Sequence, residues 1–320
     1  MTARDREAPG QRNDSIMLAV GAILFTVFAL SLGDAVVKSV SAGFVIWQIF
    51  VLRSLLAIPV LLVVIGLVLG YAGLFPKQPL WTALRSAMLV GMWVAYYVSL
   101  PHLQLSVAAA AYYTLPLFIT LFSALLARES VSRIGWLAVA TGFAGILLIL
   151  RPNAEAFDAF ALLPIVSAIL YALAMILTRT KCRAEHPLML SLALNICFIV
   201  VGLGSAFLIE ATVGLEQGDF LLAPWTPMGS QEWMTMALLA LITLVGSIGT
   251  AIAYQSGPPS VVGTFDFAYV GFAVLWGLLF FGEVPDGLSV LGMAMIVLAG
   301  ILSVRQKTGR QNLKTDTDKI

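Results

Sequence analysis

The chain contains 320 residues, of which 60% are hydrophobic and 11% are charged, and its mean hydropathy is +0.97. A soluble domain cannot bury so much apolar surface, so the composition excludes a water-soluble globular protein and predicts that a lipid bilayer surrounds most of the chain. The net charge of +1 at pH 7 gives no reason to expect a nucleic-acid partner. The cysteines, Cys182 and Cys197, are too few and too far apart for a disulfide framework or a metal site, and we expect no cofactor.

The apolar runs predict membrane-spanning helices. A helix needs ~20 apolar residues to cross ~30 Å of hydrocarbon, and lipid cannot satisfy the exposed backbone groups of other structures. The runs lack the alternation of polar and apolar residues that barrel strands require. Ten spans are expected, at residues 17–39, 44–69, 81–100, 105–126, 133–150, 158–178, 188–209, 233–254, 259–281 and 285–304.

Basic residues indicate the orientation of these spans. If both chain ends lie on the same side, that side holds nearly all the Lys and Arg outside the spans, and the other side holds only Arg151. The positive-inside rule then predicts that both termini of this multi-pass protein are cytoplasmic. Residues 1–15 and 305–320 are the expected cytoplasmic tails. The first apolar run lacks a clean small-residue cleavage site, so we expect it to stay as the first span.

The segment Ser106–Ile149 recurs in outline as Ser260–Val304. Each copy opens on Ser-Val, continues to an isolated glutamate and ends in the run Ala-Gly-Ile-Leu. The opening serines and the glutamates, Glu129 and Glu283, share one offset of 154 residues. An internal repeat near half the chain length indicates a duplicated unit.

Ten spans and a duplication give two units of five helices, at residues 16–150 and 151–304. Five is an odd number, so the second unit is expected to enter the membrane upside down relative to the first. Inverted repeats are typical of secondary transporters, which bind their solute near the middle of the membrane between the two halves.

Four ionisable residues fall inside the predicted spans, and each would cost about 2.5–3.5 kcal/mol at a helix centre. They are Asp34, Lys38, Arg53 and Asp266. Asp34 and Lys38 share one helix face, and Arg53 lies on the adjacent span, so an Asp34–Lys38 or Asp34–Arg53 pair is expected. These three residues either clamp helices together or contact the solute. Asp266 has no evident partner, which favours a role in solute or proton binding.

Aromatic residues with polar atoms gather on the same spans. They include Trp93, Tyr96, Tyr97, Tyr112, Tyr113, Tyr254, Tyr269 and Trp276. Any single one of them is consistent with core packing, but as a set at mid-depth they predict a cavity for a flat aromatic solute. Pro116 interrupts the hydrogen-bond ladder of its span and is either a hinge or a static kink.

The duplicated ten-span pattern, with Pro116 in the fourth span and a glutamate closing each paired segment, resembles the EamA family of the drug/metabolite transporter superfamily. The resemblance covers residues 16–304. Gly33–Ala57 is similar to the branch that contains bacterial riboflavin and S-adenosylmethionine uptake carriers, on the strength of Asp34, Lys38, Gln48, Arg53 and Ser54. The resemblance implies a solute cavity between spans one, three, four, six, eight and nine. The second unit departs from the pattern, since Val270 stands where Pro116 would recur.

The sequence therefore predicts an all-α polytopic membrane protein that carries a small organic solute as a monomer or homodimer. Uptake of riboflavin or a similar aromatic vitamin is favoured, with S-adenosylmethionine uptake and amino-acid or drug-metabolite export as alternatives. An intramembrane enzyme is a remote alternative, because Asp34 and Asp266 lack the sequence contexts of an aspartyl protease. The expected solute-binding residues are Asp34, Lys38, Gln48, Arg53, Trp93, Tyr97, Tyr112, Tyr113, Asp266 and Tyr269, with Pro116 as the hinge.

Overall fold

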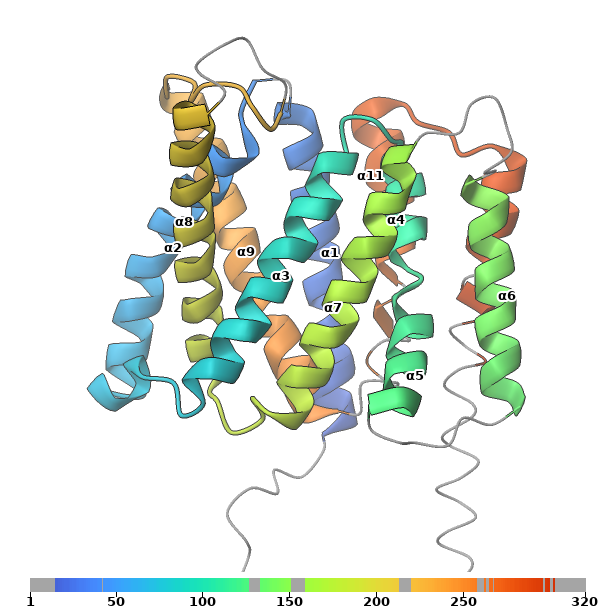
Figure 1. Ribbon diagram of the computed structural model, residues 1–320, viewed down its shortest axis with the longest axis horizontal. Coiled ribbons are helices and arrows are strands. Elements are labelled where there is room, and N and C mark those ends of the chain that lie inside the picture. Colours follow the sequence, from blue (N-terminus) through green and yellow to red (C-terminus); the bar gives the residue numbers. More distant parts are fainter. Residues whose placement is uncertain are drawn as a thin grey trace, which may run out of the picture.

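The computed structural model describes residues 15–41, 43–126, 133–150, 159–212, 220–257, 262, 265–266, 268–295, 297–299 and 302. These residues form helices and no strand, and the helices run roughly along one direction (Figure 1). The α-helices are α1 (Ile16–Val40), α2 (Ile46–Val68), α3 (Pro79–Ser99), α4 (Leu105–Tyr112), α5 (Leu115–Leu126), α6 (Arg133–Leu150), α7 (Leu163–Thr180), α8 (Pro187–Thr212), α9 (Ser230–Ser256) and α11 (Ala268–Phe281). Short 3₁₀ helices cover Tyr71–Leu74 and Ala159–Leu162, and residues 287–295 and 297–299 are also helical.

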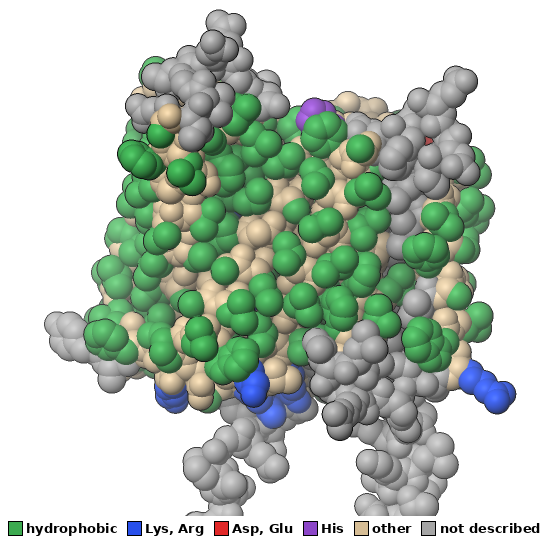
Figure 2. Space-filling view, viewed as in Figure 1, with side chains coloured by type: hydrophobic (Ala, Val, Ile, Leu, Met, Phe, Trp, Pro, Cys, Tyr) green, Lys and Arg blue, Asp and Glu red, His purple; other side chains and the backbone are tan. Residues whose placement is uncertain are grey.

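The outer surface of the bundle is apolar. Within the part of the chain that the structure describes, five helical segments are long and apolar enough to cross a membrane, at Ile16–Val40, Ile46–Val68, Ala159–Thr180, Pro187–Ile209 and Ser230–Ser256. Large hydrophobic side chains such as Leu67, Phe207 and Phe25 are exposed, whereas Asp34 and Arg53 are buried. In Figure 2, hydrophobic side chains cover the middle of the molecule, and Lys and Arg side chains lie at one end. The chain is an all-α polytopic membrane protein, as the composition predicts.

The helix contacts occur in matching pairs. α3 packs against α7 as α9 packs against α1, and α3 contacts α8 as α9 contacts α2. The contact of α11 with α1 has its counterpart in the contact of α5 with α7. This pattern is expected if α1, α2, α3 and α5 of one unit correspond to α7, α8, α9 and α11 of a second. Residues 151–158, where the predicted boundary falls, lie outside the described residues, as do Glu129 and the predicted tails, apart from Ser15.

Glycines permit the close crossing of α1 and α9. A Cβ atom on Gly33 would lie 2.7 Å from the Ile242 side chain, and one on Gly249 would overlap the Thr26 hydroxyl. Small residues at helix contacts allow neighbouring backbones to approach closely in a membrane, where lipid gives no hydrophobic drive for helix association. This crossing joins a helix of the first predicted unit to a helix of the second.

The predicted fourth span is divided into α4 and α5, and the break lies next to Pro116. Pro116 has no N–H to donate to the Tyr112 carbonyl, so the backbone ladder cannot continue through this point. The Thr114 N–H instead donates to the Ala111 carbonyl at 3.3 Å, which tightens the chain into a turn. The predicted interruption is confirmed, and the role of Pro116 as a hinge stays a prediction.

Candidate functional site

Asp34 lies in the interior of the bundle, with 1% of its surface exposed. The Tyr269 hydroxyl on α11 donates to Asp34 Oδ2, and the hydroxyls of Tyr269 and of Tyr96 on α3 are 3.0 Å apart. The second carboxylate oxygen, Oδ1, is buried and has no hydrogen-bond partner within the described part of the chain. The Asp34 carboxylate therefore joins α1 to α11 and α3 and keeps one acceptor unused.

Asp266 is bonded in a similar way. Its Oδ1 accepts a hydrogen bond from the Tyr113 hydroxyl and its Oδ2 accepts one from the Tyr254 hydroxyl, both at 3.1 Å. The rings of Tyr113 and Tyr269 lie 5.1 Å apart between their centres, so the surroundings of the two carboxylates are in contact.

Seven of the eight tyrosines of the chain are buried around the two aspartates. They are Tyr96, Tyr97, Tyr112, Tyr113, Tyr171, Tyr254 and Tyr269. Neighbouring rings in this group have centres 5.1–6.4 Å apart, which is the spacing of aromatic contacts. We call these tyrosines, together with Asp34, Asp266, Arg53 and Trp93, the central cluster.

Arg53, on α2, is 2% exposed and enclosed by aromatic rings. Its guanidinium carbon lies 4.5 Å from the ring centre of Phe198, 4.8 Å from Phe50, 5.7 Å from Tyr97 and 5.8 Å from Trp93. Its Nη1 donates to the Tyr97 hydroxyl at 3.3 Å, while Nε and Nη2 are buried with no partner among the residues described. Cation–π contacts stabilise the charge here, but two donor groups remain unused.

Neither ion pair predicted for Asp34 is formed, so that prediction is wrong. Lys38 Nζ lies 2.5 Å from Glu283 Oε1 and also donates to the Leu103 carbonyl at 2.6 Å. Lys38 is in the last turn of α1, so its long side chain reaches the connections that follow α3 and α11 rather than turning back towards Asp34. This ion pair therefore joins helix ends, outside the central cluster.

Gln48, at the start of α2, is also outside the central cluster. Its Nε2 donates to the Thr226 carbonyl at 2.7 Å, and its Oε1 accepts from the Thr226 N–H at 2.9 Å. These bonds hold the connection between α8 and α9 against α2. The other predicted binding residues lie together: Asp34, Arg53, Trp93, Tyr97, Tyr112, Tyr113, Asp266 and Tyr269.

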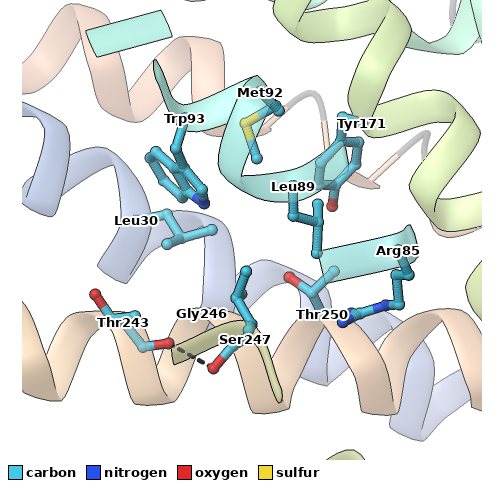
Figure 3. A pocket seen from close by; sticks show the side chains of 11 residues that line it. Leu30, Arg85, Leu89, Met92, Trp93, Tyr171, Thr243, Gly246, Ser247 and Thr250 are labelled. Atoms are coloured by element: carbon cyan, nitrogen blue, oxygen red, sulfur yellow. Dashed lines mark hydrogen bonds between the residues drawn. The ribbon is translucent and has the colours of Figure 1, made fainter. Parts of the chain in front are cut away.

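A pocket of about 30 Å³ adjoins the central cluster (Figure 3). Its walls come from α1, α3, α7, α8 and α9, which belong to both predicted units. The lining residues are Leu30, Arg85, Leu89, Met92, Trp93, Tyr171, Leu194, Thr243, Gly246, Ser247 and Thr250. This volume is enough for only about one or two water molecules. The pocket as it stands is therefore too small for an organic solute.

Arg85 also lines this pocket, although its sequence position did not predict it as a binding residue. Its place near the predicted inner end of a span groups it with the other basic residues of that side, yet it is buried, with 1% of its surface exposed. α3 begins at Pro79, so Arg85 lies six residues inside the helix, or ~9 Å along it. That depth is the signal that could have separated it from the exposed basic residues.

The profile of the EamA-like transporter family matches residues 16–151. The riboflavin transporter of Rhizobium johnstonii is 30% identical over 239 residues, which cover 74% of this chain and 73% of that protein. The chain belongs to the EamA-like transporter family. The resemblance inferred from the ten-span pattern is thereby confirmed.

Other relatives of this EamA-family protein differ in what their names describe. The pseudopaline exporter of Pseudomonas aeruginosa is 26% identical over 283 residues, or 88% of this chain and 94% of its own. The S-adenosylmethionine uptake transporter of Rickettsia conorii is 21% identical over 316 residues, which cover 95% of this chain and 99% of that protein. One crystal structure matches 91% of this chain and 97% of its own with a TM-score of 0.63 and 17% identity, which is a likeness of fold. The EamA-family chain is thus a transporter of small metabolites.

Proposed function

We propose that this EamA-family protein takes up riboflavin or a similar flat aromatic vitamin by alternating access. The observation that carries the proposal is the central cluster, in which two carboxylates, seven tyrosines and Arg53 are buried together in the membrane-spanning bundle. Ionisable side chains at membrane depth are costly, and those that occur line solute or ion pathways. The R. johnstonii relative, which is 30% identical to this chain, is named a riboflavin transporter, and this name supports the choice of solute.

The chemistry of the cluster suits a flat ring that carries polar atoms. Tyrosine and tryptophan faces offer stacking surfaces, and their hydroxyl and indole N–H groups offer hydrogen bonds at the ring edge. Asp34 Oδ1 and the Nε and Nη2 atoms of Arg53 lack partners within the described chain. An acceptor and donors are therefore available together for a solute that has both kinds of group.

The paired helix contacts support alternating access between two similar units. At one end of the bundle, Lys38 joins the end of α1 to Glu283, after α11, and to Leu103, after α3. At the other end, Arg179 donates to the Gln255 carbonyl at 3.2 Å, and Glu185 accepts from the Gln78 N–H at 2.5 Å. We infer that this closed conformation lies between an outward-open and an inward-open state, with the solute site at the interface of the units.

We assign the end of the bundle that carries the exposed basic residues to the cytoplasm. Lys77, Lys181 and Arg133 are exposed there, and basic side chains gather at one end in Figure 2. The positive-inside rule favours this orientation in the bacterial inner membrane, with both termini cytoplasmic.

Export of a metabolite is the second candidate. The P. aeruginosa relative, which aligns over 88% of this chain, is named an exporter. A carrier runs in the direction that its gradients set, so the same cluster serves either direction. S-adenosylmethionine is the alternative solute for uptake, after the Rickettsia relative.

The test is transport by the purified full chain in sealed lipid vesicles. Radiolabelled riboflavin, S-adenosylmethionine and a mixture of amino acids are offered separately, with and without an imposed proton gradient. We expect riboflavin to accumulate above the level in protein-free vesicles and unlabelled riboflavin to compete. Accumulation of another solute without riboflavin would refute the vitamin assignment, and transport of none would refute the proposal for every solute tested.

A further inference from the structure

We propose that Arg85 is a solute-recognition residue, whose guanidinium donates to a carbonyl-bearing edge of a flat heteroaromatic ring. The pyrimidinedione edge of a flavin is the chemical class that fits. The inference rests on the proposed function for its solute, while the geometry on which it depends is that of the pocket itself.

Arg85 is held in place from one side. Its Nε donates to Thr178 Oγ1 on α7 at 2.7 Å, and the same hydroxyl donates to the Ala174 carbonyl at 2.8 Å. The direction of the guanidinium is therefore fixed by a neighbour whose own hydroxyl proton is already engaged. A donor fixed in this way loses less freedom when it binds a ligand.

The opposite edge of the guanidinium has an unused donor. Nη1 of Arg85 is buried and has no hydrogen-bond partner in the part of the chain that the structure describes. The carboxylates of Asp34 and Asp266 accept hydrogen bonds from tyrosine hydroxyls rather than from Arg85. Glu283 forms an ion pair with Lys38. Arg85 has no carboxylate within ion-pair distance among the described residues, so its buried charge lacks the partner that a structural role would supply.

The surroundings of this donor match an aromatic solute. In Figure 3, the Arg85 side chain extends to the end of the pocket that Thr250 lines, and Trp93 lies at the other end. Leu89 and Met92 supply apolar wall between them. When the helices separate, a solute ring can stack on Trp93 and pack against Leu89 and Met92. The carbonyl edge of the same ring can then accept a hydrogen bond from Arg85.

The experiment compares thermal unfolding of the purified full chain, with and without riboflavin, for the wild type, Arg85→Met and Arg133→Met. Because Arg85 has no ion-pair partner among the described residues, we expect Arg85→Met to keep or raise the unfolding temperature of the solute-free protein. We also expect the riboflavin concentration needed for half-maximal stabilisation to rise at least tenfold. Arg133 is exposed at the start of α6, so its substitution should change neither quantity. Arg85→Lys, which keeps the charge without the planar fork, should bind riboflavin with intermediate affinity.

Each outcome decides the inference. A fall of several degrees in the unfolding temperature of solute-free Arg85→Met would show that Arg85 is structural and would overturn it. An unchanged riboflavin response in Arg85→Met would overturn it as well. If the wild type itself ignores riboflavin, the proposed solute is wrong and the flavin-recognition role of Arg85 is overturned with it. If the wild type responds and Arg85→Met responds equally, only the role of Arg85 is overturned.

Discussion

Asp34 and Asp266 are each hydrogen-bonded to phenolic hydroxyls, and neither has a basic partner within ion-pair distance among the described residues. A neutral hydroxyl supplies a hydrogen bond but no opposite charge, so a carboxylate held in this way stays costly in a membrane. Proton uptake or a solute group that donates to the carboxylate would each lower that cost. The tyrosines therefore keep two reactive acids in place without neutralising them.

Asp266→Asn should lower riboflavin uptake at least tenfold while leaving the amount of protein in the membrane unchanged. The asparagine carbonyl still accepts a hydrogen bond from one tyrosine hydroxyl, so the packing of Tyr113 and Tyr254 is largely kept, but the ionisable carboxyl group is lost. The measurement is the initial uptake rate, normalised to membrane abundance by immunoblot. Asp286→Asn is the matched control, because asparagine also caps the helix that begins at residue 287. Normal uptake by Asp266→Asn would remove Asp266 from the mechanism.

At the scale of helices, the contact between α1 and α9 joins the two predicted units through small residues. Gly249 packs against Thr26, and Gly33 packs against Ile242. Because a glycine has no side chain, the two helix backbones can lie close together at both points. Helices in lipid associate through such close packing and through interhelical hydrogen bonds. Asp34 on α1 and Arg53 on α2 do not pair, because α1 packs mainly against α9 and α11 whereas α2 packs mainly against α8 and α9. Each of the two side chains bonds to a tyrosine hydroxyl instead.

Gly249→Ala should destabilise the protein by about 1–3 kcal/mol, because the added methyl group overlaps Thr26 and must push α1 away. Gly204→Ala is the control: it lies on α8, and a Cβ there meets no atom within 4 Å. Alanine is a better helix former than glycine, so Gly204→Ala should be neutral or stabilising by up to ~1 kcal/mol. Unfolding temperatures of the two purified variants in detergent provide the measurement, and equal temperatures would contradict tight packing at this crossing.

At the scale of the whole molecule, charge and burial are arranged in the reverse order of a soluble protein. Apolar side chains such as Leu67 and Phe207 face outwards, and the central cluster places its ionisable groups inside. Among the described residues, the exposed basic side chains lie at one end, so a single orientation in the bilayer is favoured. The proposed transport cycle depends on this orientation, because each end of the closed bundle must open to a different compartment.

Cysteines placed at Gln104 and Thr180 should react with a membrane-impermeant maleimide from opposite sides. Both side chains are exposed, Gln104 before α4 and Thr180 at the end of α7. In intact cells, Gln104→Cys should be labelled, whereas Thr180→Cys should be labelled only after the membrane is opened. The parent chain is the control, because Cys182 is buried and Cys197 is partly buried within α8. Labelling of both sites from the same side would contradict the predicted orientation.

The hydropathy of the chain determined the all-α membrane fold, and the repeat of Ser106–Ile149 in Ser260–Val304 pointed to two related units. The break in the helix beside Pro116 could also be predicted from the sequence, because the missing N–H is a property of proline itself. These features are local or periodic, so they can be read without knowing which helices touch. The family resemblance and most of the central cluster followed from residue type and depth along each span.

Only the tertiary structure decided which side chains form hydrogen bonds and ion pairs with one another. Asp34 bonds to Tyr269, 235 residues away, and Lys38 pairs with Glu283, 245 residues away, although Asp34 and Lys38 are one turn apart. The same structure buries Arg85 against Thr178, although the sequence places it among exposed basic residues. A side chain's partner depends on how each helix is rotated and which helix lies beside it, and the whole bundle sets both by packing together.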